Sequence, residues 1–172
     1  MSRAFIEIKG EVSPKLNNIL LFRIEKLIEK GIAEVDIAIE SGGGSSEAGI
    51  EAYTFFKSYN DSKNISINTI NLFTCASSAV MYFLGGKVKT SIQGGNLLIH
   101  EGVSCLQGNY KQRELQERLL MLENINNKYI SILENNNIEI TKEQYYQGIS
   151  LSDRRLSEMG VIDKISDKID TI

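Results

Sequence analysis

Three features of this 172-residue sequence combine residue types that catalyse acyl transfer: one histidine, two adjacent serines and a run of glycines. His100 is the single histidine of the chain, so any chemistry that needs an imidazole must use it. A serine hydroxyl becomes nucleophilic when an imidazole accepts its proton, which makes Ser77 and Ser78 candidate nucleophiles. Backbone N–H groups of the glycines at 42–44 could bind the negative charge that develops on a substrate oxygen.

Each feature also has a purely structural interpretation, which the sequence leaves open. A glycine run between a strand and a helix can be a flexible turn, and a serine before a helix is most often its N-cap. A lone histidine is most often a packed or surface residue. The P-loop pattern G-x-x-x-x-G-K-[ST] is missing. Cys75 and Cys105 lack the paired spacing of a zinc site, so we expect neither a metal nor a cofactor.

The predicted elements place the three features at the ends of strands. Alternating, β-branched runs predict strands, and apolar residues spaced by three and four predict helices. The predicted strands are 4–9, 35–40, 65–72, 88–92 and 96–100, and the predicted helices are 14–30, 47–59 and 77–84, with a short turn at 73–76. Strands that alternate with helices predict an α/β domain with parallel pairing, in which sites form at strand ends.

The remainder of the chain is predicted to be helical. Residues 110–134 carry apolar side chains on more than one face, which indicates a helix that needs a partner. Thr141 and Gln144 fit a capping box that begins a short helix. Ser152 is the predicted N-cap of a further helix over residues 153–159.

Composition narrows the class of protein. One globular domain spanning residues 1–172 fits the length and the 42% hydrophobic content. A net charge of −3 argues against a nucleic-acid partner. The apolar run 79–84 is far shorter than the ~20 residues that span a bilayer. The N-terminus has no apolar segment typical of a signal peptide, and isolated cysteines fit a reducing, cytoplasmic setting.

Several short motifs, taken in order, resemble one enzyme family. SGGGSSEAG at 41–49 resembles Ser-Pro-Gly-Gly-x-x-x-Ala-Gly, CASSA at 75–79 resembles an Ala-Ala-Ser nucleophile segment, and LIH at 98–100 resembles Met-Ile-His. LQG at 106–108, LS at 151–152 and GVID at 160–163 resemble later segments of the same pattern. Together they resemble the proteolytic subunit of the Clp protease, a ClpP-like serine peptidase family, over most of residues 4–165.

The resemblance implies both a fold and roles for individual residues. The implied fold is a ClpP/crotonase-like α/β domain built from a repeated β-β-α superhelix, with a protruding handle helix at about 109–135. Ser77 matches the nucleophile and His100 the general base. The N–H groups of Gly44 (or, one register off, Gly43) and of Ser78 match the oxyanion hole. The implied substrate is a peptide or an unfolded protein, and the implied assembly is a homo-oligomeric ring or stacked rings.

Two departures from the family pattern bear on activity and partners. Gly148 stands where the family has its catalytic Asp, and losing that residue typically costs about 10⁴-fold in kcat. Asp153 lies five positions away and is the available carboxylate for a substitute third triad member. Only three residues precede the strand at 4–9, which leaves no room for the family's N-terminal docking segment. The expectation of a Clp-type ATPase partner is therefore weakened.

Three functions are consistent with these observations. The leading hypothesis is a serine endopeptidase subunit that uses Ser77 and His100. The second is a catalytically impaired structural or regulatory subunit, which the glycine at position 148 suggests. The third is a crotonase-type enzyme that binds an acyl-CoA and stabilises an enolate without needing Ser77.

Overall fold

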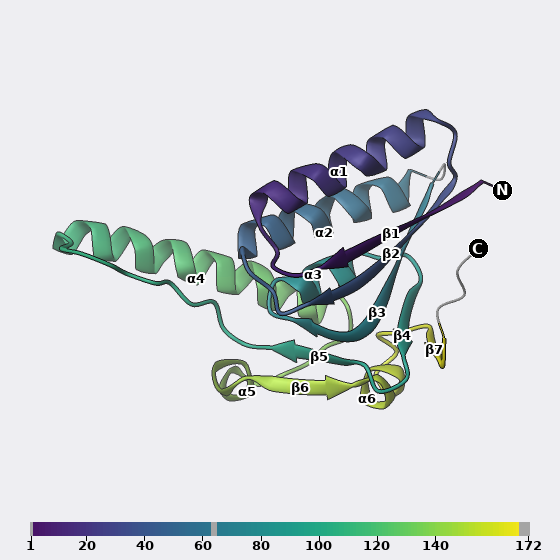
Figure 1. Cartoon of the computed structure of the whole chain (residues 1–172). Helices are drawn as coiled ribbons and strands as arrows, with labels where there is room; N and C mark the ends of the chain where they lie inside the picture. Colours follow the sequence, from purple (N-terminus) through teal and green to yellow (C-terminus); the bar gives the residue numbers. More distant parts are fainter. Residues whose placement is uncertain (1, 63–64, 169–172) are drawn as a thin grey trace.

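The computed structural model describes residues 2–62 and 65–168, which form a mostly parallel sheet, two long helices on one face of it, and one long projecting helix (Figure 1). The strands are β1 (Arg3–Lys9), β2 (Glu34–Ser41), β3 (Ser66–Ala76), β4 (Lys89–Ile92), β5 (Asn96–Ile99), β6 (Ile149–Ser152) and β7 (Lys164–Ser166). The helices are α1 (Pro14–Glu29), α2 (Ser46–Asp61), α3 (Ala79–Leu84), α4 (Gln112–Glu134), α5 (Lys142–Gln147) and α6 (Asp153–Glu158).

The strands are arranged in the order β1-β2-β3-β4-β7, and all neighbours along this path are parallel. Parallel neighbours require crossover connections, which α1 and α2 provide on the same face of the sheet (Figure 1). The predicted α/β class with parallel pairing is therefore confirmed. Ser13 and Ser45 cap α1 and α2 by accepting hydrogen bonds from backbone N–H groups in the first turn.

The third strand is longer than predicted and has two partners in succession. β3 continues to Ala76, so the prediction of a turn at 73–76 is wrong. Its first part pairs with β4 at 69–71, and its last part pairs with β5 through Thr74, Cys75 and Ala76. Phe73 and Thr74 are both exposed, which breaks the alternation that a sequence pattern requires. The strand is held there by the hydrogen bonds of β5.

The C-terminal segment, which was predicted to be helical, also contains two short strands. β6 runs antiparallel to β5, and β7 runs parallel to β4. β6 and β7 have only four and three residues in a segment whose sequence pattern predicts helix, and their partners lie far away in the sequence. The capping box of Thr141 and the N-cap of Ser152 are confirmed.

The core lies between the sheet and the helices on its covered face. α3 is buried over its whole length, and Ile24 of α1 and Phe56 of α2 are fully buried against Ile37 and Ile39 of β2. Truncating a core aromatic such as Phe56 to alanine typically costs about 3–5 kcal/mol. This packing provides the rigid support for the strand ends.

Only the C-terminal part of α4 packs against this core. Tyr129, Ile132 and Leu133 are buried, whereas Leu119 and Leu120 are 58% and 59% exposed. The rest of the helix projects away from the body of the molecule, as the predicted handle does (Figure 1). Among the described residues, no helix is both long enough and apolar enough to cross a membrane.

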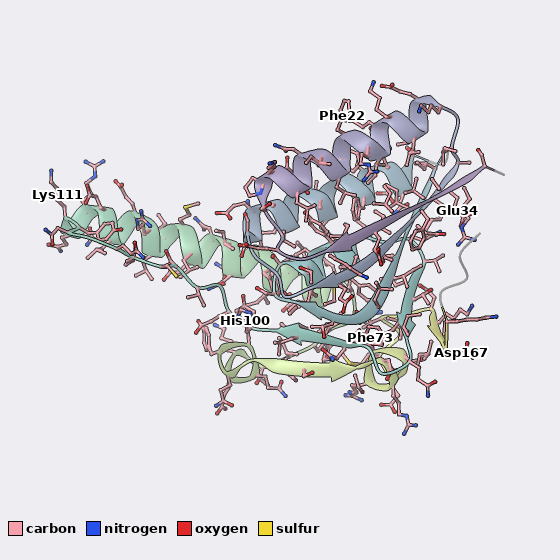
Figure 2. All side chains as sticks on the ribbon, viewed as in Figure 1. Phe22, Glu34, Phe73, His100, Lys111 and Asp167 are labelled. Atoms are coloured by element: carbon pink, nitrogen blue, oxygen red, sulfur yellow. The ribbon has the colours of Figure 1, made fainter. Side chains whose placement is uncertain are left out.

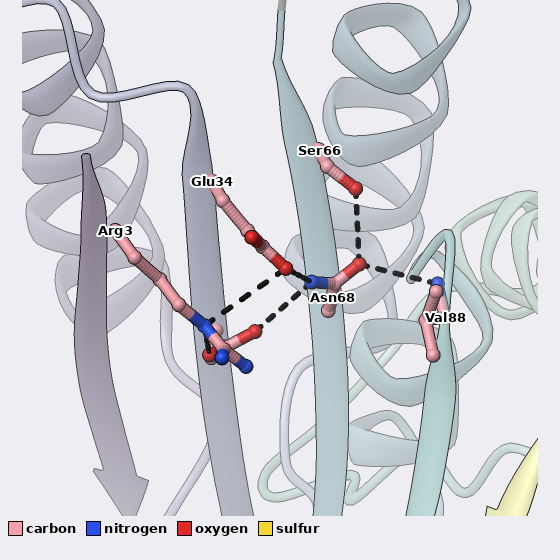
Figure 3. Close-up of polar contacts among 6 residues, drawn as sticks. Arg3, Glu34, Ser66, Asn68 and Val88 are labelled. Carbon is pink, nitrogen blue, oxygen red and sulfur yellow. Dashed lines mark hydrogen bonds and ion pairs between the residues drawn. The ribbon is translucent and has the colours of Figure 1, made fainter. Parts of the chain in front are cut away.

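The uncovered face of the sheet carries a polar network near the amino ends of the strands (Figure 3). Arg3 Nε pairs with the buried carboxylate of Asp36. Asn68 Nδ2 donates to Asp36 Oδ1 (3.0 Å) and to Glu34 Oε1 (2.8 Å). Asn68 Oδ1 in turn accepts from Ser66 Oγ at 3.1 Å. Each buried charge at this end of the sheet is thus matched by a charge or a hydrogen bond.

Candidate active site

Ser77 follows β3 directly and has a backbone conformation that is rare for a residue with a side chain. Its φ is +54°, and the only other described non-glycine residue with a positive φ is Asn137. Its N–H donates to the carbonyl of Leu98 (2.8 Å), and its carbonyl accepts from the N–H of Val80 (3.0 Å) and the hydroxyl of Tyr129 (2.8 Å). These bonds hold a sharp strand-to-helix turn, the arrangement that presents a nucleophile above a sheet.

The two adjacent serines differ in what their hydroxyl groups can reach. Ser77 is partly exposed, and its Oγ has no hydrogen-bond partner within the described part of the chain. Ser78 is fully buried, its Oγ has no partner among the described residues, and it does not cap α3. The N-cap interpretation therefore fails for both serines, and only Ser77 can meet a substrate.

His100 follows β5 and lies at the root of the segment that leads to α4 (Figure 2). The pairing of Ala76 with Leu98 brings the ends of β3 and β5 together, so Ser77 and His100 share one edge of the sheet. The imidazole Nδ1 lies 2.7 Å from the carbonyl oxygen of Glu101. A carbonyl only accepts, so this bond places the proton on Nδ1 and leaves Nε2 as a proton acceptor.

No hydrogen bond joins Ser77 to His100 in the described part of the molecule. Catalytic hydrogen bonds are often long before substrate binds and tighten in the complex. The shared sheet edge is therefore the observation that connects the two residues, and the contact of Nδ1 with the Glu101 carbonyl favours the tautomer in which Nε2 is the acceptor.

The glycine loop passes directly over Ser77. A Cβ on Gly43 would lie 2.5 Å from Ser77 Cβ and 3.2 Å from Ser77 Oγ, and its φ of +97° also excludes most side chains. The N–H of Gly43 donates to Ser41 Oγ at 3.1 Å. Gly43 therefore makes the close approach to the serine, but its own N–H is already occupied.

Two other N–H groups at this edge of the sheet are unoccupied. Those of Gly44 and Ser78 donate to no group among the described residues. Gly44 is held in place because its neighbours pair with Val12: Val12 N–H donates to Gly43 O and Ser45 N–H donates to Val12 O, both at 2.8 Å. Unpaired N–H groups in a held backbone can bind a developing oxyanion.

The position beside His100 that could hold a third triad member is occupied by a glycine. A Cβ on Gly148 would lie 3.6 Å from His100 Cβ, and nothing else except Ile99 O comes within 4 Å of it. No side chain from this position contacts the imidazole.

Asp153 is not near His100, because β6 runs antiparallel to β5. Asn96 pairs with Ser152 and Ile99 pairs with Ile149, which places Asp153 at the far end, about 17 Å along the strand from His100. Its carboxylate accepts from the N–H groups of Gly94 (2.7 Å) and Arg154 (2.6 Å). The structure therefore does not bring this predicted substitute to the site; Asp153 is the first residue of α6, and its carboxylate binds the N–H of Gly94 in the turn between β4 and β5.

Sequence reasoning missed two residues of α4 that touch the site. Tyr129 donates to the carbonyl of Ser77, and Asn126 Oδ1 accepts from the N–H of Gly102 at 2.9 Å. Burial raises the pKa of Tyr129 well above its ordinary value, so its hydroxyl stays protonated as a donor. The available signal was their i, i+3 spacing on one face of the helix.

Cys75 is close to Ser77 in sequence but does not take part in the chemistry. It is fully buried, its Sγ lies 3.2 Å from the carbonyl of Ala79, and burial raises the pKa of the thiol. A buried thiol is inert as a nucleophile. Within residues 2–62 and 65–168, no group of three or more His, Cys, Asp or Glu could hold a metal ion.

An open groove of about 490 Å³ begins at Gly44 and leads away along α4. Its walls are the loop after β2, the segment after His100 and one face of α4. The lining residues are Gly44, Ser45, Ser46, Glu47, Val103, Ser104, Arg118, Met121, Leu122 and Ile125. Neither Ser77 nor His100 lines this groove, which begins at Gly44, next to the Gly43 that approaches Ser77. An open groove of this size could hold an extended chain.

Comparisons with known proteins agree on a family and a fold. The sequence model of a family described as Clp protease matches residues 1–168. Among solved structures, a ClpP1 point mutant from Listeria monocytogenes superposes with a TM-score of 0.80 at 15% sequence identity. That match covers 96% of this chain and 92% of the other. No curated protein sequence matches.

Proposed function

The chain belongs to the Clp protease family, and we propose on this premise that it is a serine peptidase subunit with Ser77 as nucleophile and His100 as base. One observation carries the proposal: the strained Ser77 turn and an imidazole with a free Nε2 lie at the same edge of the sheet. The partly exposed, unbonded Ser77 hydroxyl supports the same assignment.

The proposed reaction uses these groups in two steps. Ser77 Oγ attacks the carbonyl carbon of the scissile peptide bond while His100 Nε2 takes the hydroxyl proton. The N–H groups of Gly44 and Ser78 bind the oxyanion, and the protonated imidazole then gives its proton to the leaving amine. Water then attacks the acyl-enzyme while Nε2 takes one of its protons; the bond between the acyl carbon and Ser77 Oγ breaks, and the imidazolium returns the proton to Oγ.

A glycine at position 148 limits the rate that we expect. No carboxylate from this position stabilises the imidazolium that forms during attack. Removal of that group costs a serine protease about 10⁴-fold in kcat, and the oxyanion hole and binding preserve a residual rate. We therefore expect slow turnover of peptides, with acylation easier to detect than complete hydrolysis.

The substrate and the assembly follow from two surfaces. The groove beside Gly44 fits a peptide or an unfolded segment. The exposed Leu115, Leu119, Leu120 and Met121 of α4 favour self-association of this chain into a ring or stacked rings. Sedimentation of the wild type and of a Leu119→Lys, Leu120→Lys double variant tests the assembly. A smaller species is expected only for the variant.

The mechanism is tested with a fluorophosphonate probe, which acylates an activated serine without needing turnover. The wild type should be labelled and Ser77→Ala should not. Ser58→Ala, at an exposed position on α2 remote from the strand ends, is the matched control and should be labelled like the wild type. Absence of wild-type labelling, or equal labelling of Ser77→Ala, contradicts the proposal.

Gly148 also favours a second candidate function, a structural subunit that has lost catalysis. In that case neither probe labelling nor peptide hydrolysis would exceed the Ser77→Ala background, while the assembly would still form. Hydrolysis of small peptides above that background excludes this alternative.

A further inference from the structure

One peptide unit, between Glu101 and Gly102, lies between His100 and helix α4. Its carbonyl oxygen accepts from His100 Nδ1 at 2.7 Å. Its N–H donates to Asn126 Oδ1 at 2.9 Å. The peptide is trans, so these two groups point in opposite directions and the planar unit links the imidazole to the helix.

We propose that Asn126 is a positioning residue for His100, acting through this peptide unit. Asn126 holds the peptide so that the Glu101 carbonyl takes the place of a triad carboxylate behind the imidazole. The inference rests on the proposed role of His100 as a base, and it names the group that keeps the Nδ1 proton in position. That group is a backbone carbonyl, which no sequence motif records.

Further contacts fix the orientation of Asn126. Its Oδ1 also accepts from the hydroxyl of Tyr145 at 2.9 Å. The carbonyl of Tyr145 accepts from the N–H of Glu101 at 3.1 Å. The Gly102 N–H can only donate, so the amide oxygen of Asn126, and not its NH₂ group, must face the peptide, and the Tyr145 hydroxyl then donates to the same oxygen.

The chain has a glycine where the peptide approaches the helix. A Cβ on Gly102 would lie 3.0 Å from both Asn126 Oδ1 and Leu122 Cδ1. Such contacts are tighter than a side chain normally makes, so a larger residue would push the peptide away from α4. The absence of a side chain at 102 is thus what permits the bond to Asn126.

The physical consequence is a histidine that is oriented but only weakly stabilised in its charged form. A carbonyl selects the tautomer as a carboxylate does, because both accept the Nδ1 proton. Its partial charge stabilises an imidazolium less than a full negative charge would, and the hydrogen bond from Gly102 to Asn126 increases its polarity.

The test is nuclear magnetic resonance of the full chain with ¹⁵N-labelled histidine. Because the chain has one histidine, its two ring nitrogens can be assigned without ambiguity, at a pH at which the ring is neutral. In the wild type the proton should reside on Nδ1. Asn126→Leu removes the acceptor and should shift the ring toward the Nε2–H tautomer. Asn126→Asp keeps an oxygen and should preserve the wild-type state.

A matched variant and a kinetic measurement distinguish a positioning role of Asn126 from a general effect on the structure of α4. Asn127→Leu changes a neighbouring exposed asparagine of α4 and should leave both tautomer and labelling rate unchanged. Asn126→Leu should lower the rate of fluorophosphonate labelling on the order of 10²-fold, the cost of a misplaced catalytic group. Asn126→Asp should keep most of the wild-type labelling rate.

Two results would overturn the inference: a wild-type imidazole protonated on Nε2, or an Asn126→Leu variant that keeps the Nδ1 proton and the labelling rate. If Asn126→Leu fails to fold, Gly102→Ala displaces the same peptide without changing α4 and should shift the tautomer in the same direction. Because the tautomer is read without catalysis, a wild type with the Nδ1 proton but no probe labelling refutes the proposed function and not this inference.

Discussion

The two ends of the same sheet are built in opposite ways. Near the amino ends, Asp36 and Asn68 are buried and their polar atoms are matched by Arg3, Glu34 and Ser66 (Figure 3). At the carboxyl ends, the Ser77 and Ser78 hydroxyls and the N–H groups of Gly44 and Ser78 have no partners among the described residues.

This difference shows that the hydrogen-bonding groups that remain unpaired lie at the carboxyl ends of the strands. An unpaired buried polar group destabilises a fold, and the Ser78 hydroxyl is such a group, whereas Ser77 is partly exposed and Gly44 is exposed. Under the proposed function, the oxyanion of a tetrahedral intermediate would bind the N–H groups of Gly44 and Ser78, while the buried Ser78 hydroxyl would stay unpaired. Changes at the carboxyl end should therefore alter activity, and changes at the amino end should alter stability.

The largest effect is expected for Gly43→Ala at the carboxyl end. The new Cβ would lie 2.5 Å from Ser77 Cβ and 2.7 Å from Ala76 O, in a backbone region that alanine rarely adopts. We expect probe labelling to fall to background and the free energy of unfolding to fall by about 1–3 kcal/mol.

Gly42→Ala is the matched control for that substitution. A Cβ at position 42 meets nothing within 4 Å, and its φ is not in the positive region. Its labelling and its denaturant midpoint should stay close to those of the wild type. Equal damage by both variants would show that the loop as a whole, and not the approach to Ser77, is sensitive.

Asp36→Ala should disrupt the polar network at the amino ends of the strands and leave the carboxyl ends unchanged. It removes one partner of Arg3, which also lies 3.9 Å from Glu34 Oε1, and one acceptor of Asn68. Because Arg3 is 36% exposed and can be rehydrated, we expect a loss of about 1–2 kcal/mol in urea unfolding, below the cost of breaking a fully buried pair. The labelling rate of the folded variant should not change, and a large change would contradict the separation of the two ends.

Ser78→Ala should have the opposite sign in a stability measurement. The Ser78 hydroxyl is fully buried and unpaired, so its removal abolishes a desolvation penalty. We expect the free energy of unfolding to rise by up to about 1 kcal/mol in urea titrations. Destabilisation would mean that the hydroxyl has a partner, such as an ordered water molecule.

A further prediction concerns the dependence of stability on alkaline pH. Burial, with the nearby Glu101 charge, raises the pKa of Tyr145 from its ordinary value of 10.0 to about 12. The folded state then holds this proton more tightly, so the stabilisation is complete below pH 10 and is lost as pH rises to about 12. Urea unfolding across that range should show the decline, and Tyr145→Phe should make it shallower.

The parts of the fold that follow local rules were predictable. The motifs at 41–49, 75–79 and 98–100 indicated the family and the α/β fold, and both are confirmed. Capping residues marked the starts of α1, α5 and α6, because a cap acts within three residues of itself. The end of β3 and the strands β6 and β7 were missed, because their hydrogen-bond partners are distant in the sequence.

The candidate site likewise contains residues that the sequence could identify and residues that depend on distant contacts. Ser77, His100, Gly44 and Ser78 were named from residue type and motif, and their catalytic roles stay predictions. Asp153 was named from sequence distance alone, and the antiparallel register of β6 moved it away from His100. Asn126 and Tyr129 could not be found from a motif, because their contacts depend on where α4 meets the body.

By itself, the sequence determined which residue types were available: one histidine, a glycine at 148, and the caps and periodicities that set the helices and most strands. The tertiary structure alone decided which serine is exposed, which glycine approaches it, and which atom accepts the Nδ1 proton of His100. The physical reason is range. Propensities and caps act over a few residues, whereas the partner of His100 is a backbone carbonyl whose position depends on α4, and a backbone group has no residue type to read.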